Sequence, residues 1–284
     1  MTYTLIRNAM ADTASRTAYN ALATATFGLS FENWYNSGHF SGNHIPYTLM
    51  DGEKAVANIS VNTMDILYNG TIRKYLQLGT VMTDPAHRGK GLQKQIFDEI
   101  LKDFSGKYDG LFLFANKSVL DFYPKLNFKR ADYCNYSKPV SHKPAQLKKL
   151  DMSAGADVEL LKKYYAKGNP FSALQVVNNS SLLMFYCGSF FADFVYYIPQ
   201  YDAVVIADVE ADSMTCYGIY CDGGNMDDIL SAFPVKNVSL GFTPTDTAGC
   251  EITKSQDDDT ALFIHTTGEN IFTQPLLFPE LFHT

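Results

Sequence analysis

The hydrophobic residues in the first half of the chain follow two periods, one typical of strands and one of helices. Short apolar runs predict strands at 3–7, 45–50, 54–63 and 73–83. Between the last three runs stand the turn pairs Asp51-Gly52 and Asn69-Gly70. The pattern therefore predicts an antiparallel meander.

Two amphipathic segments predict helices beside this meander. The first covers about 12–26, where Asp12 can cap the first turn. The second covers 92–104 and has a continuous apolar face, formed by Leu92, Ile96, Phe97, Ile100, Leu101 and Phe104. The aromatic, glycine-rich stretch 31–44 is expected to be a loop or broken helix over a pocket.

The rest of the first half predicts a strand at 110–115, a short helix at 117–126 and a strand near 128–137. The basic, proline-containing segment 138–149 is typical of a linker. We therefore expect two domains, one over residues 1–140 and one over residues 141–284.

The second half is also mixed in its pattern. It predicts helices near 153–167 and 225–233, and strands near 183–187, 193–198, 203–209, 214–219, 237–242 and 260–265. This order faintly echoes the first half without a strict repeat, so we expect an acidic α/β domain that is a degenerate copy of the first.

Charge is divided unevenly along the 284 residues, whose formal net charge is −7. Residues 1–140 carry 15 Lys and Arg against 12 Asp and Glu, whereas residues 141–284 carry 8 Lys, no Arg and 18 Asp and Glu. An acidic chain of this kind is a poor nucleic-acid binder. The first half suits an anion and the second half a cation, unless the acidic half serves only solubility.

Composition excludes several classes of protein. With 46% hydrophobic and 19% charged residues the chain is expected to be globular, and we expect neither a membrane span nor a secretory leader. Its five cysteines form no C-x-x-C pair, which indicates a reducing cytoplasm. No metal site is expected, because Asp257-Asp258-Asp259 is typical of a solvated turn.

The chemistry-bearing segment follows the third strand of the meander. There the loop Arg88-Gly89-Lys90-Gly91 leads into the helix at 92–104. Free N–H groups at a helix start, flanked by glycines and basic residues, form a cradle for a pyrophosphate. The loop matches neither a P-loop nor a Rossmann fingerprint, and the simpler interpretation is a turn with basic residues on the surface.

A change of phase in strand 73–83 sharpens this picture. Apolar residues stand at the even positions Leu76 and Leu78 and then at the odd position Val81. One extra residue explains the change, so we expect a β-bulge near Gly79–Thr80 that opens a slot in the sheet.

Together with the later run F-Y-P-K-L-N-F (122–128), the segment V-M-T-D-P-A-H-R-G-K-G-L (81–92) resembles the GCN5-related N-acetyltransferases (GNAT). Their loop pattern [RQ]-x-x-G-x-[GA] is met by Arg88 and Gly91 and departs at Gln93. Asn127 stands where these proteins commonly have glycine. The resemblance covers about residues 3–137 and implies an α/β (α+β) fold, with a mixed, mostly antiparallel sheet flanked by helices.

The resemblance also implies a site for acetyl-CoA as cosubstrate. The strand end is implied to pair with the pantetheine arm and the loop to bind the pyrophosphate, through Val81, Met82, Thr83, Arg88, Gly89, Lys90, Gly91, Leu92 and Gln93. A backbone N–H near Val81 is implied to polarise the thioester. Tyr123 is implied to protonate the leaving thiolate, and Asn116 to hold the pantetheine or the helix of Tyr123. The alternatives are that Tyr123 only packs and Asn116 only caps a helix.

The acceptor is less determined. We expect direct acetyl transfer to a primary amine of a small cationic acceptor; the alternatives are a protein or peptide amine, or a non-catalytic acyl-CoA-binding protein. The general base is open between Glu32, His39, His44, Asp65 and a water chain. The oligomeric state is left open too.

The apolar end of the chain, 269–284, is expected to be docked against the second domain. Its layout resembles the aminoglycoside-acetylating "enhanced intracellular survival" proteins, in which a terminal carboxylate enters the active site. Thr284 is the residue to which that role would fall. No second acetyl-CoA site is expected, because the second half lacks arginine.

Overall fold

A first sheet carries the predicted meander. The computed structural model describes residues 3–255, 257–266 and 270–284. The strand order of this sheet is β1-β2-β3-β4-β5-β15-β6, with β9 attached to β3. The bounds are β1 Thr4–Ile6, β2 His44–Asp51, β3 Lys54–Tyr68, β4 Thr71–Thr83, β5 Gly110–Ala115, β6 Lys129–Arg130, β9 Leu174–Val177 and β15 Ala261–Thr266. All pairs are antiparallel except β4–β5, which confirms the mixed, mostly antiparallel sheet.

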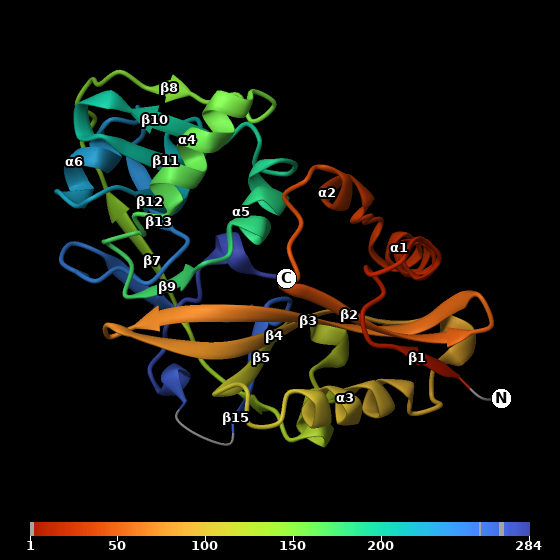
Figure 1. Cartoon of the computed structure of the whole chain (residues 1–284). Coiled ribbons are helices and arrows are strands. Elements are labelled where there is room, and N and C mark those ends of the chain that lie inside the picture. The colour runs from red at the N-terminus through yellow and green to blue at the C-terminus, as the bar shows by residue number, and fades with distance from the viewer. Residues whose placement is uncertain (1–2, 256, 267–269) are drawn as a thin grey trace.

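Helices cover both faces of this sheet. Helices α1 (Thr13–Phe27) and α2 (Glu32–Asn36) lie on one face and α3 (Leu92–Asp103) on the other (Figure 1). The predicted cap is confirmed, because the Asp12 side chain accepts a hydrogen bond from the backbone N–H of Ser15. The segment expected to be a short helix forms two 3₁₀ turns, Lys117–Val119 and Tyr123–Leu126.

A second sheet has the strand order β14-β7-β13-β12-β11-β10-β8. Its strands are β7 Cys134–Pro139, β8 Lys148–Lys149, β10 Val195–Ile198, β11 Ala203–Glu210, β12 Ser213–Tyr220, β13 Asn237–Leu240 and β14 Glu251–Lys254. Its helices are α4 Gly155–Tyr165, α5 Ser180–Cys187 and α6 Met226–Ser231. The segment expected as one strand near 128–137 is therefore two strands, β6 and β7, in different sheets.

The second sheet repeats the topology of the first. In the first sheet β1, β2, β3 and β4 are antiparallel neighbours and β5 is parallel to β4. In the second, β8, β10, β11 and β12 are antiparallel neighbours and β13 is parallel to β12. Helices also fall at corresponding places in the chain, with α4 and α5 before β10 and α6 before β13.

The two sheets exchange a strand. Strand β15, from the end of the chain, lies between β5 and β6 in the first sheet. Strand β7, which precedes the expected boundary at residue 140, lies between β13 and β14 in the second sheet. The first sheet therefore contains two strands from the second half of the chain, β9 and β15, and the second sheet contains β7 from the first half.

The end of the chain packs between the sheets. One hydrophobic cluster joins side chains of the first sheet, such as Phe112, to side chains of the second, such as Ile206. Buried residues of the tail complete it: Ile271, Phe272, Leu276, Phe278, Leu281 and Phe282. The halves consequently share a core.

One predicted strand is wrong. Residues 183–187 belong to helix α5, which begins after Asn179, whose side chain accepts from the N–H of Leu182. Most of this helix is apolar and buried, so its hydrophobic run lacks the polar face that distinguishes a helix from a buried strand. Strands β9 and β14 were not predicted, and neither was β8, which lies in the segment 138–149 expected to be a linker and pairs with β10.

Three general findings concern the described part of the chain. No helix there is long and apolar enough to cross a membrane. The described His, Cys, Asp and Glu residues form no group of three that could hold a metal ion. All five cysteines are free thiols.

Candidate active site

The predicted β-bulge is confirmed in β4. Ser60 of β3 lies opposite Gly79, and Asn58 lies opposite Met82, so that two residues of β4 face Ile59 alone. The extra residue is taken up at Thr80, whose φ is +42°. This is the left-handed region, which a β-branched residue adopts rarely.

Beyond the bulge, β4 and β5 separate. Their parallel pairing covers only Tyr75–Gln77 with Gly110–Phe112. The continuation of β4, from the bulge to Thr83, still pairs with β3 on its other side. From the bulge to Thr83, the edge of β4 that faces β5 therefore pairs with no described strand, and the carbonyl oxygens of Met82 and Thr83 accept from the side chains of Gln93 and Arg88.

The glycine-rich loop leads from this edge to α3. Asp84 caps a 3₁₀ turn, Pro85–His87, by accepting from the N–H of Ala86 at 2.9 Å. Gly89 and Gly91 then adopt φ values of +75° and +73°, which favour glycine. Among the described residues no side chain caps α3, so its first N–H groups stay available to an anion.

The basic residues of the loop surround this helix start. Arg88 and Lys90 are exposed, and Arg88 Nε donates to the carbonyl oxygen of Thr83 at 3.3 Å. Positive side chains, a helix start and left-handed glycines provide donors and charge suited to a diphosphate. These residues of the chain therefore fit the phosphate end of acetyl-CoA.

Two further residues of the expected site are engaged with the protein itself. The side-chain amide of Gln93 donates to Met82 O and to Thr83 Oγ1, the latter at 2.8 Å, which ties α3 to β4. Asn116 is exposed and accepts from the N–H of Ser118 at 3.0 Å, as a helix cap. Leu92 is buried in the core under α3.

Tyr123 lies in the hydrophobic core that α3 covers. Its ring contacts Phe122, Phe128 and Phe263, at centroid distances of 5.3, 5.9 and 5.6 Å. Phe263 belongs to β15, so a strand from the other half of the chain positions this tyrosine. Burial raises the pKa of Tyr123 to about 12, and its hydroxyl is therefore protonated at neutral pH.

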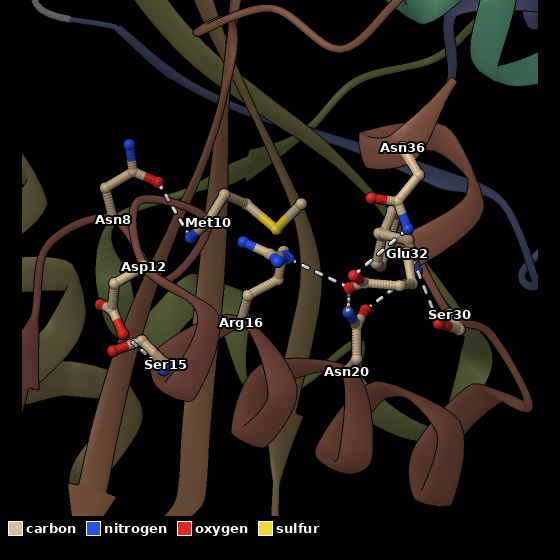
Figure 2. A network of polar contacts seen from close by, with 10 residues as sticks. Asn8, Met10, Asp12, Ser15, Arg16, Asn20, Ser30, Glu32 and Asn36 are labelled. Atoms are coloured by element: carbon tan, nitrogen blue, oxygen red, sulfur yellow. Dashed lines mark hydrogen bonds and ion pairs between the residues drawn. The ribbon is translucent and has the colours of Figure 1, made fainter. Parts of the chain in front are cut away.

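The candidate bases differ in their surroundings. Figure 2 shows Arg16, Asn20 and Asn36 converging on Glu32, with Arg16 Nε and Asn20 Nδ2 each at 3.0 Å from its carboxylate. Asp65 accepts from Asn178 at 3.1 Å. His39 is half-buried, and burial lowers its pKa. Because its partners Arg16 and Asn20 belong to α1, the carboxylate of Glu32 holds α2 against α1.

His44 belongs to a set of buried polar side chains that was not expected from the sequence. We call this set the buried network: Tyr19, His44, Asn58, Ser60, Asn62 and Thr80. All except Thr80 are buried. Polar residues alternate with apolar ones along β3, which is typical of a strand with one solvated face; helices α1 and α2 cover that face instead (Figure 1).

The tail reaches the bulge. A Cβ added to Gly79 would lie 2.7 Å from the carbonyl carbon of Thr284. Asn62 Nδ2 donates to Thr284 Oγ1 at 3.0 Å. With its amide oriented to suit its neighbours, Gln77 accepts from Thr284 N at 2.9 Å and donates to Phe282 O at 2.8 Å.

Aromatic rings from both halves of the chain cover the buried network. Phe31 and Trp34, beside α1, lie 5.7 and 5.0 Å from the ring of Phe185 in α5. Trp34 Nε1 also donates to the carbonyl oxygen of Ser181 in α5, at 3.0 Å. The second half of the chain thus encloses the side of the bulge on which α1 and α2 lie.

Known proteins share this sequence pattern and this fold. Residues 6–131 match the family model of the acetyltransferase (GNAT) domain. No curated protein matches the chain.

Three solved structures with the same fold cover most of the chain. A probable N-acyltransferase of Enterococcus faecalis V583 is 14% identical and has a TM-score of 0.67, over 94% of this chain and 73% of that one. Eis1 of Mycobacterium abscessus is 13% identical and has a TM-score of 0.62, over 93% of this chain and 73% of that one. A GCN5-related N-acetyltransferase of Kribbella flavida is 13% identical and has a TM-score of 0.60, over 93% of this chain and 72% of that one.

Proposed function

We propose that the chain transfers an acetyl group from acetyl-CoA to the primary amine of a small cationic acceptor, and the match of residues 6–131 to the acetyltransferase (GNAT) domain supports this. The observation that carries the proposal is the separation of β4 from β5 at the bulge, followed along the chain by the uncapped start of α3. This arrangement places a free strand edge and an anion cradle in line along one segment of the chain.

Acetyl-CoA supplies an activated acyl group as a thioester. Arg88, Lys90 and the first N–H groups of α3 bind its diphosphate. The edge of β4 along Val81, Met82 and Thr83, which pairs with no described strand on that side, holds the pantetheine arm as a neighbouring strand would. The slot at the bulge then receives the acetyl end.

The chain's own residues supply the remaining chemistry. The N–H of Val81 stabilises the negative charge that develops on the carbonyl oxygen, as an oxyanion-type donor. Tyr123, kept protonated by burial, gives its proton to the thiolate as the carbon–sulfur bond breaks. The amine attacks the carbonyl carbon directly, and no cysteine nucleophile is required.

The enclosure of the site supports a small acceptor. Helix α5 places Phe185 against Phe31 and Trp34, which leaves less room for a protein chain than an open groove does. Aromatic faces attract ammonium groups, and the acidic second half attracts cations from solution. A protein or peptide amine is the alternative acceptor, and binding without catalysis is the alternative function.

Calorimetric titration with acetyl-CoA followed by a thiol-release screen of cationic amines tests this function. We expect one binding site per chain and release of CoA thiol with at least one small amine. Turnover only of peptides would favour the alternative acceptor. Tight binding without any turnover would favour the non-catalytic function, and no binding would refute the proposal.

Replacing Arg88 with glutamine is expected to weaken acetyl-CoA binding about tenfold, because one charge-assisted contact to the diphosphate is lost at an exposed site. The salt dependence of the dissociation constant should decrease as well. Lys102→Gln is the control, since Lys102 lies in the last turn of α3, at the end of the helix remote from the loop. Equal effects of the two substitutions would mean that Arg88 contributes only to net charge.

Replacing Tyr123 with phenylalanine is expected to lower kcat about 100-fold through loss of a general acid, with acetyl-CoA affinity unchanged. Because the pKa of Tyr123 is about 12, titration of this hydroxyl should not reduce the wild-type kcat anywhere up to about pH 10. Tyr108→Phe is the control, since it removes a half-buried hydroxyl that packs on the same core cluster. Full turnover by the Tyr123 variant would leave packing as its role.

A further inference from the structure

Thr80 occupies a conformation that needs support. Its φ of +42° lies in the left-handed region, where a β-branched side chain is strained by its own Cβ. Such a residue persists only when surrounding contacts fix it. The contacts that fix Thr80 therefore also fix the course of the chain at the bulge.

Asn58 makes the most direct of these contacts. Its Nδ2 donates to the carbonyl oxygen of Thr80 at 2.9 Å and to Ser60 Oγ at 3.0 Å, and Ser60 Oγ also accepts from the Thr80 hydroxyl. The other end of the Asn58 amide is held as well, because its Oδ1 accepts from Thr48 Oγ1 at 2.7 Å. Asn58 is fully buried, so these partners are not replaced by solvent.

The hydrogens of the rest of the buried network can be placed so that every polar group has a partner. Asn62 Nδ2 donates to Thr284 Oγ1 and to Gln77 O, so Asn62 Oδ1 accepts from His44 Nδ1 at 2.7 Å. Burial lowers the pKa of His44 to about 4, so the ring is neutral at pH 7 and its Nε2 accepts from the Tyr19 hydroxyl at 3.1 Å. The Tyr19 oxygen is then left to accept from Ser60 Oγ at 3.3 Å.

Every member is thus satisfied, and the directions are consistent from Thr80 through Ser60 and Tyr19 to His44. A fully satisfied network of buried, uncharged groups specifies one geometry, since any rotation leaves a polar atom unpaired. Its members come from four elements, α1, β2, β3 and β4. The network therefore ties the bulge to the helix and strands behind it.

We propose that Asn58 and Tyr19 are positioning residues that hold Thr80 in its left-handed conformation and so direct the N–H of Val81 into the acyl slot. This inference rests on the proposed function, because that function gives the Val81 N–H its role. It also explains why the strained conformation of Thr80 persists, because the buried network keeps the bulge in the shape that the reaction needs.

A double-mutant cycle between positions 58 and 80 tests the inference. Asn58→Ala is expected to lower kcat for CoA-thiol release at least tenfold, as for partial loss of an oxyanion donor, while the dissociation constant of acetyl-CoA changes less than about threefold. Adding Thr80→Gly should restore much of the lost kcat, because glycine adopts positive φ without side-chain strain. Loss of a merely structural contact would not be repaired by that second change.

Ala211→Gly provides the matched control. Ala211 also has a positive φ, +46°, but lies at an exposed turn between β11 and β12. Combined with Asn58→Ala it should restore nothing. If Asn58→Ala does not fold, Tyr19→Phe replaces it, because the stacking of this ring on Phe31 at 5.4 Å survives loss of the hydroxyl.

Denaturant unfolding of the same four variants supplies a readout that needs no acceptor. Asn58→Ala should lower the folding equilibrium constant in both backgrounds, but by different factors. The factor should be smaller when position 80 is glycine than when it is threonine, by about fivefold or more. If the wild-type chain releases no thiol, the proposed function is refuted, and the unfolding measurements alone then test whether Asn58 holds Thr80 in its conformation. Additive effects in unfolding, or no recovery of kcat where kcat is measurable, would overturn the inference.

Discussion

Gly79→Ala is expected to lower kcat about 100-fold and to destabilise the protein by about 1–3 kcal/mol, as an overpacked core does. The reason is contact with the tail, since a Cβ at this position would lie 2.7 Å from the carbonyl carbon of Thr284 and 2.8 Å from its O and Oγ1. These atoms cannot easily retreat, because Asn62 and Gln77 hold Thr284. Either the tail or the bulge must shift.

Activity and thermal unfolding should be measured together for this variant. Gly42→Ala is the control, because a Cβ there meets nothing within 4 Å and should change neither quantity. Unaltered kinetics in Gly79→Ala would mean that the tail can move at no cost. Deleting Thr284 from the Gly79→Ala variant should restore stability; if kcat stays low, Thr284 itself contributes to the reaction, as the resemblance in layout implies.

A chain ending after residue 140 is expected not to fold. It would retain β1 to β6 but lose β15, which pairs with β5 along residues Ala115 to Gly110. The backbone groups at that edge of β5 would be unpaired, and buried β5 side chains such as Leu111, Phe112 and Leu113 would become exposed to solvent. Strand β7 would have no sheet to join, because its partners β13 and β14 lie in the missing half.

Production of residues 1–140 and 141–284, separately and together, checks this expectation. We expect each fragment alone to aggregate or to lack cooperative unfolding, and co-production to yield a complex that binds acetyl-CoA. The intact chain nicked by protease within 141–147 is the control, since it keeps both exchanged strands. A soluble, cooperatively unfolding fragment 1–140 that binds acetyl-CoA would instead establish residues 1–140 as an independent domain.

The local elements were largely predictable because short-range physics decides them. Periodicity located the meander, α3 and β5, and an aspartate placed at the right spacing marked the start of α1. The bulge was predictable for the same reason, since one inserted residue reverses the phase of the apolar side chains in β4. Left-handed glycines and basic residues marked the cradle at α3.

Other features depended on partners remote in the sequence. Helix α5 was mistaken for a strand because it is apolar throughout, and only its burial between α2 and the tail explains that composition. Asn58, Ser60 and Asn62 were given no role from the sequence; in the structure they are buried and bond to Thr80, Tyr19 and His44 respectively. The alternation of polar and apolar residues along a strand does not show whether solvent or another element covers the polar face.

The sequence by itself determined the strands of the meander, helices α1 and α3, the bulge, the anion cradle and the resemblance that implies acetyl transfer. Tertiary structure alone decided the exchange of β7 and β15, the arrival of Thr284 at Gly79 and the closing of the buried network. Local propensity and spacing act over a few residues, but the choice of a strand's neighbour is made by burial of whole faces. That choice brings residues more than 200 positions apart, such as Asn62 and Thr284, into one site.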